Sequence, residues 1–378
     1  MKIFTVTMVP VNPPYDDAVK NMVINIARRI RRHSFLLVSS FFGKAFRREA
    51  NVTFLRSVFQ KQGRHSMSFM QKLYVFIMVL LNMGKVDLFQ FFVTPQPYFS
   101  RVFKRLLQDK GKKSLQVVSS IHTLYGKNDD KVIADLFFAD RVVVYSDFTK
   151  KSLEEKGVKN VVRVYPGIDC ERFAPKPGTD SSFNIVYAGS YGVLAGAFPF
   201  EDLSAVAEKV TGRFKKANFI MACRIRTAKD ILLRRAFEKM VERKGMKDNF
   251  TFLDTVEDMP ALFRKSDIGI MPAKDAMSGV LEIPMVLLEM ACAGKPVIYG
   301  DVPPLGELAD KGIGIMLADR CAGAYAEKIL ALLEDRDSAA SIGKRSKNAV
   351  EKYFNIDVMA REYERIYEDL ETGRRRSG

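Results

Sequence analysis

The sequence predicts an α/β protein built from two doubly wound, parallel-sheet domains. Short apolar segments alternate with amphipathic ones along the chain, which is the pattern of strands and helices in such domains. The chain has 378 residues, more than one domain usually needs. A segment rich in Pro, Gly and Ser at about residues 166–182 interrupts the alternation and predicts the linker between the two domains.

Each half of the chain contains its own series of expected strands. Helices are expected between the strands, for example over residues 18–32 and 99–108, and a last helix is expected over residues 358–371. The predicted organisation is an N-terminal domain over 1–168, a C-terminal domain over 169–357, and a final helix with a basic tail over 358–378. The expected strands are IFTVTMV, SFLLVSS, DLFQFFV, LQVVSSI and RVVVYS in the first half, and FNIVYAG, NFIMACR, FTFLD, DIGIMPA and PVIYG in the second.

Composition is that of an ordinary globular protein, with 47% hydrophobic and 28% charged residues. The longest apolar run, residues 73–81, is about half the roughly 18 residues that a membrane-spanning helix needs. The opening residues, MKIFTVTMVPV, read as a strand and lack the charged lead and cleavage site of a signal peptide. We therefore expect a cytoplasmic protein, with peripheral association at the inner face of the membrane as an additional expectation.

Positive charge is concentrated in the first third of the chain. Residues 1–120 contain 20 Lys/Arg and 5 Asp/Glu, a net charge of +15, whereas the whole chain carries +16. Such a region attracts anionic surfaces, whether lipid headgroups, polyanionic glycans or nucleic acid. The alternative is a solvated basic face without a partner. No nucleic-acid recognition module is recognisable, so nucleic acid is not expected as a partner.

The cysteines and histidines do not suggest a metal site. The four cysteines are widely spaced and form no CxxC pair, so they predict neither a disulfide framework nor a zinc site. We expect no structural metal. The cysteines are Cys170, Cys223, Cys292 and Cys321.

An acidic residue inside an apolar helix is the most informative feature of the second half. A helix is expected from Pro284 to a stop at Gly294, followed by a strand over residues 296–299. Glu289 then lies among apolar neighbours, where a carboxylate is costly unless it meets a donor, such as a sugar hydroxyl. The alternative is a position at the helix rim, paired with a Lys or Arg. The first backbone amides of this helix, those of Met285, Val286 and Leu287 after Pro284, suit a phosphate.

The segment from Leu281 to Gly294, followed by KPVI and Glu307, resembles the donor-binding segment of the group 1 glycosyltransferases. These are retaining sugar-nucleotide enzymes of GT-B fold, and the chain is similar to bacterial and archaeal mannosyl- and glucosyltransferases. The resemblance implies that Glu289 binds the ribose hydroxyls of the donor. The family carries another glutamate eight positions earlier, whereas Glu282 is one position late. Either the loop shifts and Glu282 still reaches the sugar, or that role is missing.

Two further segments carry the resemblance. His122 follows the apolar strand VVSSI; a lone histidine there is more often structural, but the resemblance implies that it hydrogen bonds near the reacting centre of the donor sugar. The segments ADRVVVYSDFTKKSLEEKGV and VRVYPGIDCERFAP resemble the strand, helix and linker that follow in the family. Ser146 is expected to cap the helix, Gly167 and Asp169 to shape the linker turn, and Phe173 to anchor it.

The segment that would bind the diphosphate departs from the family pattern. The family carries an Arg and a Lys after the first strand of the second domain, whereas Ser190 and Ala195 stand there, framed by Gly189 and Gly196. A departing diphosphate needs positive charge or hydrogen-bond donors. Candidates are the amides of residues 189–192, the start of the Pro284 helix, and the side chains of Arg224, Arg226 and Lys274, although the two arginines are equally compatible with ordinary surface.

Two features of the first domain are open to two readings. The family has a Gly-Gly pair between the first strand and the first helix, whereas this chain reads VNPPYDDAVKNM there. Asp16 or Asp17 is expected to cap the helix that starts at Ala18, and orienting an acceptor hydroxyl is the alternative. The apolar residues 69–83 predict a helix packed beneath a sheet. The alternative is a partly exposed face that dips into a membrane, helped by Lys61, Arg64 and Lys72.

The resemblance implies two Rossmann-like domains facing across a cleft, with the last helix crossing back to the first domain. It implies a hexosyltransferase-type enzyme that moves a sugar from a nucleotide-diphosphate-sugar, with UDP or GDP as the nucleotide, to an acceptor hydroxyl with retention. A lipid-linked or glycan acceptor at the membrane surface is the candidate acceptor. Neither a metal nor a cofactor is expected. The alternative function is a catalytically impaired homologue that acts as a nucleotide-binding, glycan-binding or scaffolding protein.

Overall fold

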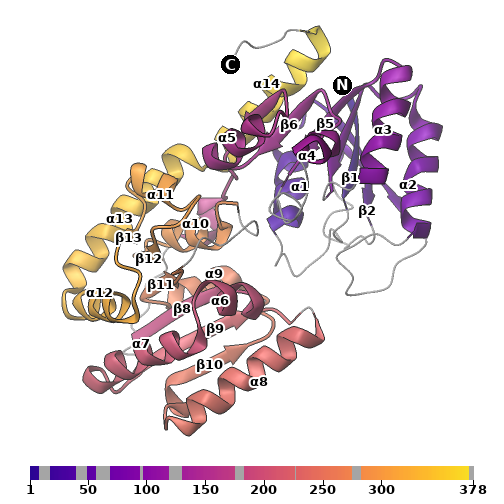
Figure 1. The fold of residues 1–378 in the computed structure, drawn as a ribbon. Coiled ribbons are helices and arrows are strands. Elements are labelled where there is room, and N and C mark those ends of the chain that lie inside the picture. Colours follow the sequence, from indigo (N-terminus) through magenta and orange to yellow (C-terminus); the bar gives the residue numbers. More distant parts are fainter. Residues whose placement is uncertain are drawn as a thin grey trace. The chain divides into compact units, whose positions relative to one another are not determined.

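The computed structural model describes residues 1–7, 18–39, 49–56, 69–93, 97–118, 130–174, 183–225, 227–274 and 282–373. Two compact units make up the chain (Figure 1). The first unit combines Met1–Gly167 with Ile356–Gly378, and the second is Ile168–Asn355. Each unit contains a parallel sheet flanked by helices, which confirms the predicted fold class.

The described strands of the first unit form a seven-stranded sheet in the order β3-β2-β1-β4-β5-β6-β7. All neighbouring strands are parallel, and β1 and β4 are buried almost throughout because helices cover the sheet. The strands are β1 (Lys2–Thr7), β2 (Ser34–Ser39), β3 (Val52–Arg56), β4 (Leu88–Phe92), β5 (Lys113–Val117), β6 (Arg141–Val144) and β7 (Val161–Arg163).

Helices connect the strands of this sheet, and the chain's last helix completes the unit. Phe91 of β4 packs edge-on against Phe103 and Phe138, with ring centroids 5.3 Å away in both cases. This aromatic cluster anchors the helices that cover that face. The helices are α1 (Ala18–Arg29), α2 (Phe69–Asn82), α3 (Pro97–Asp109), α4 (Asp130–Leu136), α5 (Asp147–Glu155) and α14 (Ile356–Thr372).

Helix α14 belongs to the first unit although it follows the second in the sequence, so the chain crosses back as predicted. It packs beside α1, and Arg32 forms ion pairs with Glu364 at 2.9 Å and Glu368 at 2.6 Å. The buried Tyr367 hydroxyl donates a hydrogen bond to Gln90 Oε1 of β4 at 2.9 Å. Apolar burial and this polar contact together fix the final helix against the first sheet.

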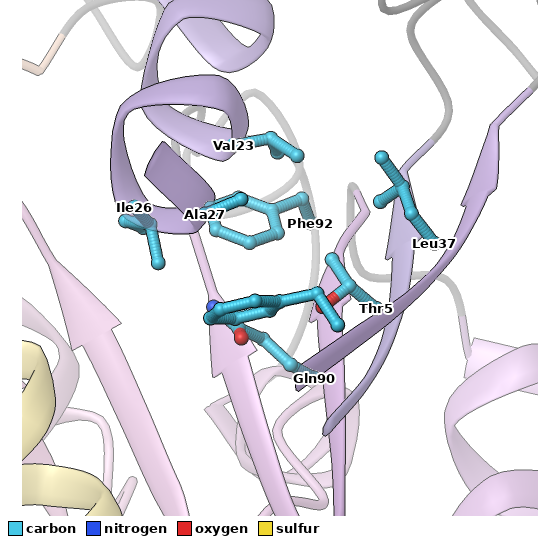
Figure 2. Close-up of a pocket in the computed structure, with 8 residues that line it drawn as sticks. Thr5, Val23, Ile26, Ala27, Leu37, Gln90 and Phe92 are labelled. Atoms are coloured by element: carbon cyan, nitrogen blue, oxygen red, sulfur yellow. The ribbon is translucent and has the colours of Figure 1, made fainter. Parts of the chain in front are cut away.

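A small cavity of about 10 Å³ lies between α1 and the sheet of the first unit (Figure 2). Val23, Ile26 and Ala27 of α1 line one side, and strand residues that include Thr5 and Gln90 line the other. This volume corresponds to about one water molecule. The cavity is therefore a gap in core packing and not a substrate site.

The described strands of the second unit form a six-stranded sheet in the order β10-β9-β8-β11-β12-β13. The strand order reverses at β8. Strands β9 and β10, which follow β8 in the chain, extend the sheet on one side, and β11 pairs with β8 on the other side. Ligands of open α/β sheets bind at the carboxyl ends of strands at such a reversal. The strands are β8 (Phe183–Gly189), β9 (Ala217–Cys223), β10 (Phe250–Leu253), β11 (Ile268–Met271), β12 (Val297–Gly300) and β13 (Ile315–Leu317).

Helices again link these strands, and two short 3₁₀ helices join them. The 3₁₀ helix η2 (Cys170–Phe173) lies in the predicted linker, and η3 (Lys247–Asn249) precedes β10. The α-helices are α6 (Tyr191–Ala197), α7 (Phe200–Arg213), α8 (Ala228–Arg243), α9 (Met259–Lys265), α10 (Met285–Cys292), α11 (Gly306–Asp310), α12 (Ala322–Glu334) and α13 (Arg336–Tyr353). Among the described helices, none is long and apolar enough to cross a lipid bilayer.

A disulfide joins Cys170 of η2 to Cys292, the last residue of α10, with 5.1 Å between the two Cα atoms. The expectation of no disulfide was wrong. The two cysteines are 122 residues apart, so only the folded second unit brings them together. The other two thiols are free, Cys223 in the core and Cys321 at the surface.

Candidate functional site

Helix α10 begins directly after Pro284, which occupies the N-cap position. A proline side chain cannot accept a hydrogen bond, so the N-cap residue itself provides no side-chain acceptor for the N–H groups of the first turn. The Leu287 N–H donates to the Pro284 carbonyl at 3.1 Å, and the N–H groups of Met285 and Val286 come before it. These donors and the helix dipole make this end of α10 suitable for an anion.

The other end of α10 is fixed as predicted. Gly294 adopts a φ of 73°, a left-handed conformation that suits glycine, and the chain enters β12 three residues later. The helix packs closely on the sheet because Gly269 of β11 has no side chain: a Cβ there would overlap the sulfur of Met290. Gly294 therefore ends the helix, and the missing side chain of Gly269 allows the helix to pack closely on the sheet.

Glu289 lies in the middle of α10 with only 9% of its surface exposed. Within the described residues its carboxylate accepts no hydrogen bond and forms no ion pair within 4.0 Å, so the predicted alternative of direct pairing with a Lys or Arg finds no partner there. Burial raises the pKa of Glu289 from 4.5 to about 7, and the positive charge of Arg172 opposes that rise. The carboxylate therefore has unused acceptor capacity.

Arg172 lies close enough to Glu289 to affect its pKa, and nothing in the sequence marked it as a site residue. It lies in η2, two residues after Cys170, and the disulfide holds η2 against the end of α10. Its guanidinium is exposed and attracts Glu289 through space. The linker segment was recognisable, but the spacing between Arg172 and Glu289 along the chain gives no indication that they approach each other.

Glu282 lies on the chain just before α10 and is 4% exposed. The structure thus buries both glutamates of the segment, on the two sides of the helix start. Whether Glu282 reaches a bound sugar remains a prediction.

Gly189 and Ser190 end β8 and start α6. Ser190 is the N-cap of α6, and its Oγ accepts a hydrogen bond from the Val193 N–H at 3.2 Å. A Cβ at Gly189 would lie 2.7 Å from the hydroxyl oxygen of Tyr187, which in turn donates to the Ser190 carbonyl at 3.3 Å. Both residues therefore shape the loop through helix capping and close packing, and neither supplies charge.

Lys274 lies beyond the carboxyl end of β11, next to the end of α6. Its N–H donates to the carbonyl of Ala197 at 2.7 Å, which places it close in space to the segment where the family carries a lysine. The Lys274 ammonium pairs with Asp202 at 2.6 Å, a partner that the sequence did not reveal. Arg224, directly after β9, is half-buried.

Some of the other predicted residues have the structural roles expected of them, and others lie outside the described residues. Ser146 is the N-cap of α5 and accepts from the Thr149 N–H at 3.0 Å, as predicted. Phe173 is buried and stacks on Phe263 of α9 at 6.1 Å, as an anchor should. Asp169, expected in the linker turn, is the N-cap of η2, which begins three residues after Gly167. The predicted residues that lie outside the described residues are Asp16, Asp17, Lys61, Arg64, His122 and Arg226. In the described parts of the chain, no group of three or more His, Cys, Asp or Glu is arranged to hold a metal ion.

Two family models match the chain, one in each half. Residues 19–172 match Glycosyltransferase Family 4, and residues 184–335 match Glycosyl transferases group 1. The second match contains β8, α6 and the whole of α10. Both halves of the two-unit fold are therefore assigned to the same class of protein.

Relatives in sequence are glycosyltransferases. The putative colanic acid biosynthesis glycosyltransferase WcaL of Escherichia coli K12 is 26% identical over 226 residues, 54% of this chain and 50% of that protein. A GDP-mannose-dependent phosphatidylinositol monomannoside mannosyltransferase of Mycobacterium tuberculosis is 28% identical over 127 residues, 32% of this chain and 33% of that protein. The chain thus spans half or less of the length of these curated relatives.

Solved structures share the fold over almost the whole chain. Anabaena HepE, in complex with UDP and glucose, superposes with a TM-score of 0.76 at 15% identity, covering 98% of this chain and 100% of that one. Sucrose-phosphate synthase from Thermosynechococcus elongatus gives a TM-score of 0.79 at 15% identity, covering 99% and 100%. The fold and the matched segments define a GT-B glycosyltransferase. The family-model matches over residues 19–172 and 184–335 together place the chain among the glycosyltransferases, with the second half assigned to group 1.

Proposed function

We propose that this protein transfers a hexose from a nucleoside-diphosphate sugar to an acceptor hydroxyl, with retention at the anomeric carbon. The observation that carries the proposal is the buried Glu289, whose carboxylate accepts no hydrogen bond from the described residues. It lies on a helix whose N-cap residue, Pro284, supplies no capping side chain. The solved structures of HepE with UDP and with UDP-glucose, and the GDP-mannose dependence of the mycobacterial relative, support a donor of this class.

In this proposal Glu289 binds the ribose of the donor. The two ribose hydroxyls donate to the two carboxylate oxygens, and charge-assisted hydrogen bonds of this kind are strong in a buried site. The carboxylate accepts best when it is ionised. Because burial brings its pKa to about 7, nucleotide binding and loss of the Glu289 proton are coupled.

The diphosphate lies at the start of α10 in the same proposal. The N–H groups of Met285 and Val286 supply donors, whereas the predicted third donor, the Leu287 N–H, already donates to the Pro284 carbonyl. Lys274 supplies a cation beside α6 if the phosphate competes with Asp202 for it. Glycosyl transfer breaks the bond between the anomeric carbon and the diphosphate oxygen and forms one to the acceptor oxygen on the same face, while the acceptor proton passes to the departing diphosphate. His122 and Glu282 orient the sugar, and no metal ion takes part.

The proposed acceptor is a hydroxyl of a glycan or of a lipid-linked saccharide, with Asp16 or Asp17 orienting it. The net charge of +15 over residues 1–120 supports a reaction beside an anionic membrane surface on the cytoplasmic side.

The direct test is release of nucleoside diphosphate, and transfer of labelled sugar, from a panel of UDP- and GDP-sugars in the presence of EDTA. Glu289→Ala should lower kcat/KM at least about 100-fold, the loss expected when a buried charge-assisted contact is removed. Glu327→Ala, at an exposed glutamate of α12 in the same unit, is the matched control and should retain activity. Equal activity of the Glu289→Ala variant would contradict the proposal.

A nucleotide-binding or scaffolding role is the second candidate function. The observation in its favour is that Ser190 is used as a helix cap and Lys274 is paired with Asp202, so that the described diphosphate side has little unpaired charge. Nucleotide binding that depends on Glu289, together with no turnover of any donor in the panel, would establish this role in place of transfer.

A further inference from the structure

Helix α2 of the first unit exposes a continuous row of large apolar side chains. Its opposite side is buried through Val75 and Val79, and Phe76 packs edge-on against Phe103 of α3, with ring centroids 6.2 Å apart. Helices α2 and α3 lie side by side on one face of the sheet (Figure 1). We call the exposed row the α2 apolar face. Its members are Phe69 at 76% exposure, Met70 at 46%, Leu73 at 41%, Ile77 at 44%, Leu80 at 44% and Leu81 at 60%.

The spacing of these residues places them on one side of a helix. Positions 70, 73, 77, 80 and 81 follow the repeat of three and four residues that defines a single helical face. Isolated exposed apolar residues are common in proteins, but a contiguous row of this kind marks an interaction surface. The α2 apolar face therefore requires a partner that accepts hydrocarbon.

Charge identifies the kind of partner. Residues 69–93 and 97–118, which contain α2, β4, α3 and β5, carry eight Lys/Arg and two Asp/Glu. One of the two carboxylates, that of Asp87, already accepts from the Lys2 N–H at 2.6 Å. Within α2 itself Lys72 is the one charged residue. The apolar row thus lies in a strongly basic segment of the chain, which includes the neighbouring helix α3.

We propose that the α2 apolar face lies in the interface of an anionic lipid bilayer. An interfacial helix buries its apolar side at the boundary between headgroups and acyl chains, and nearby Lys and Arg side chains bind anionic headgroups. At 14 residues α2 is about 21 Å long, enough to lie along the interface. A second copy of this chain is a poorer partner, because pairing α2 with itself would bring two basic surfaces together.

This inference rests on one part of the proposed function, the reaction beside an anionic membrane surface, and names the helix that would contact that surface. It does not depend on the donor site, which is in the other unit. Vesicle binding and nucleotide binding are measured separately, so the failure of one is distinguishable from the failure of the other.

The test is co-sedimentation of the full chain with vesicles of phosphatidylglycerol and phosphatidylcholine in equimolar amounts, compared with pure phosphatidylcholine. The wild type should bind the anionic vesicles and should bind less as salt is raised. Ile77→Glu/Leu81→Glu should weaken the vesicle partition constant at least about tenfold, because it removes apolar insertion and adds repulsion.

The chain offers a closely matched control for this variant. Ile231 and Leu232 of α8 are exposed by 40% and 65%, close to the 44% and 60% of Ile77 and Leu81, and they lie in the second unit. Ile231→Glu/Leu232→Glu makes the same change in charge and hydrophobicity and should bind vesicles like the wild type. Thermal unfolding of both variants verifies that they are folded.

A tryptophan reporter provides a second measurement, since the chain contains no Trp. Leu81→Trp should shift its emission to the blue and be quenched by brominated acyl chains, whereas Leu232→Trp should show neither effect. Absence of vesicle binding by the wild type, equal binding by the Ile77→Glu/Leu81→Glu variant, or an unquenched Leu81→Trp would overturn the proposal. So would a lipid-free dimer that this double variant dissociates, because the face would then be a subunit contact.

Discussion

Glu289 is a buried carboxylate that accepts no hydrogen bond from the described residues. The sequence placed it in an apolar helix, and the structure adds its burial, the nearby Arg172 and a pKa of about 7. A glutamate of this kind destabilises the folded protein when it is ionised. Its retention in the core of the second unit is explained by a ligand that supplies donors, which is the role proposed for the ribose.

The pH dependence of stability tests this account at the level of the residue. Folding raises the pKa of Glu289, so the folded state binds more protons than the unfolded state between about pH 4.5 and pH 7. The contribution of Glu289 to the free energy of unfolding therefore falls as pH rises through this window and is constant above it. The total change in the free energy of unfolding is roughly 3 kcal/mol, because each unit of pKa difference corresponds to about 1.36 kcal/mol.

Glu289→Gln, which resembles the protonated side chain, should remove this dependence. We expect the variant to match the wild type in urea denaturation at about pH 4 and to exceed it in stability at about pH 8. Glu327→Gln, at an exposed position, should follow the wild type at both values. A Glu289→Gln variant that is less stable than the wild type at about pH 8 would show that the carboxylate has a stabilising partner within the protein.

At the scale of elements, the sequence located the strands and helices that carry strong apolar patterns. The ten expected strands correspond to β1, β2, β4, β5, β6, β8, β9, β10, β11 and β12. The missed strands are β3, β7 and β13, of which β7 and β13 are three residues long and too short to show a pattern. Helix α10 was predicted with its stop at Gly294, because Pro and Gly mark helix ends through backbone geometry.

Features of the candidate site were predictable only where the residues involved lie close together in the sequence. Glu289 and the start of α10 are neighbours in the sequence, and the structure confirms the predicted helix and the apolar surroundings of Glu289. The approach of Arg172 to Glu289, the Lys274–Asp202 pair and the Cys170–Cys292 disulfide are long-range contacts, and residue spacing carries no information about them. A single sequence therefore identified the helix of the site but not its electrostatic environment.

The disulfide between η2 and α10 can be tested by counting free thiols and by measuring stability. Unfolded protein prepared without reductant should show two free thiols, those of Cys223 and Cys321, and four after reduction. Cys170→Ser/Cys292→Ser should unfold at lower urea concentration, with a loss of about 2–4 kcal/mol, since the bond closes a loop of 122 residues. Cys321→Ser, at an exposed free thiol, is the matched control. Four titratable thiols in unreduced protein would contradict this assignment.

At the scale of the whole molecule, the chain combines two sheet units with different character. The first carries nearly all of the excess positive charge and the α2 apolar face, and the second carries the α10 site. The fold class and the return of α14 to the first unit followed from the alternation of elements and the family resemblance, and the structure confirms both. In the proposed function, the basic first unit faces the anionic acceptor surface and the second unit binds the donor.

The central claim is that Glu289 and α10 bind a nucleoside diphosphate, and calorimetric titration with UDP and GDP tests it most directly. The wild type should bind at least one of them at about pH 8 and should bind it more weakly below about pH 7, where Glu289 becomes protonated. Glu289→Ala should weaken binding at least about tenfold, whereas Glu327→Ala should bind like the wild type. Binding of neither nucleotide, or equal affinity of the wild type and the Glu289→Ala variant, would contradict the account.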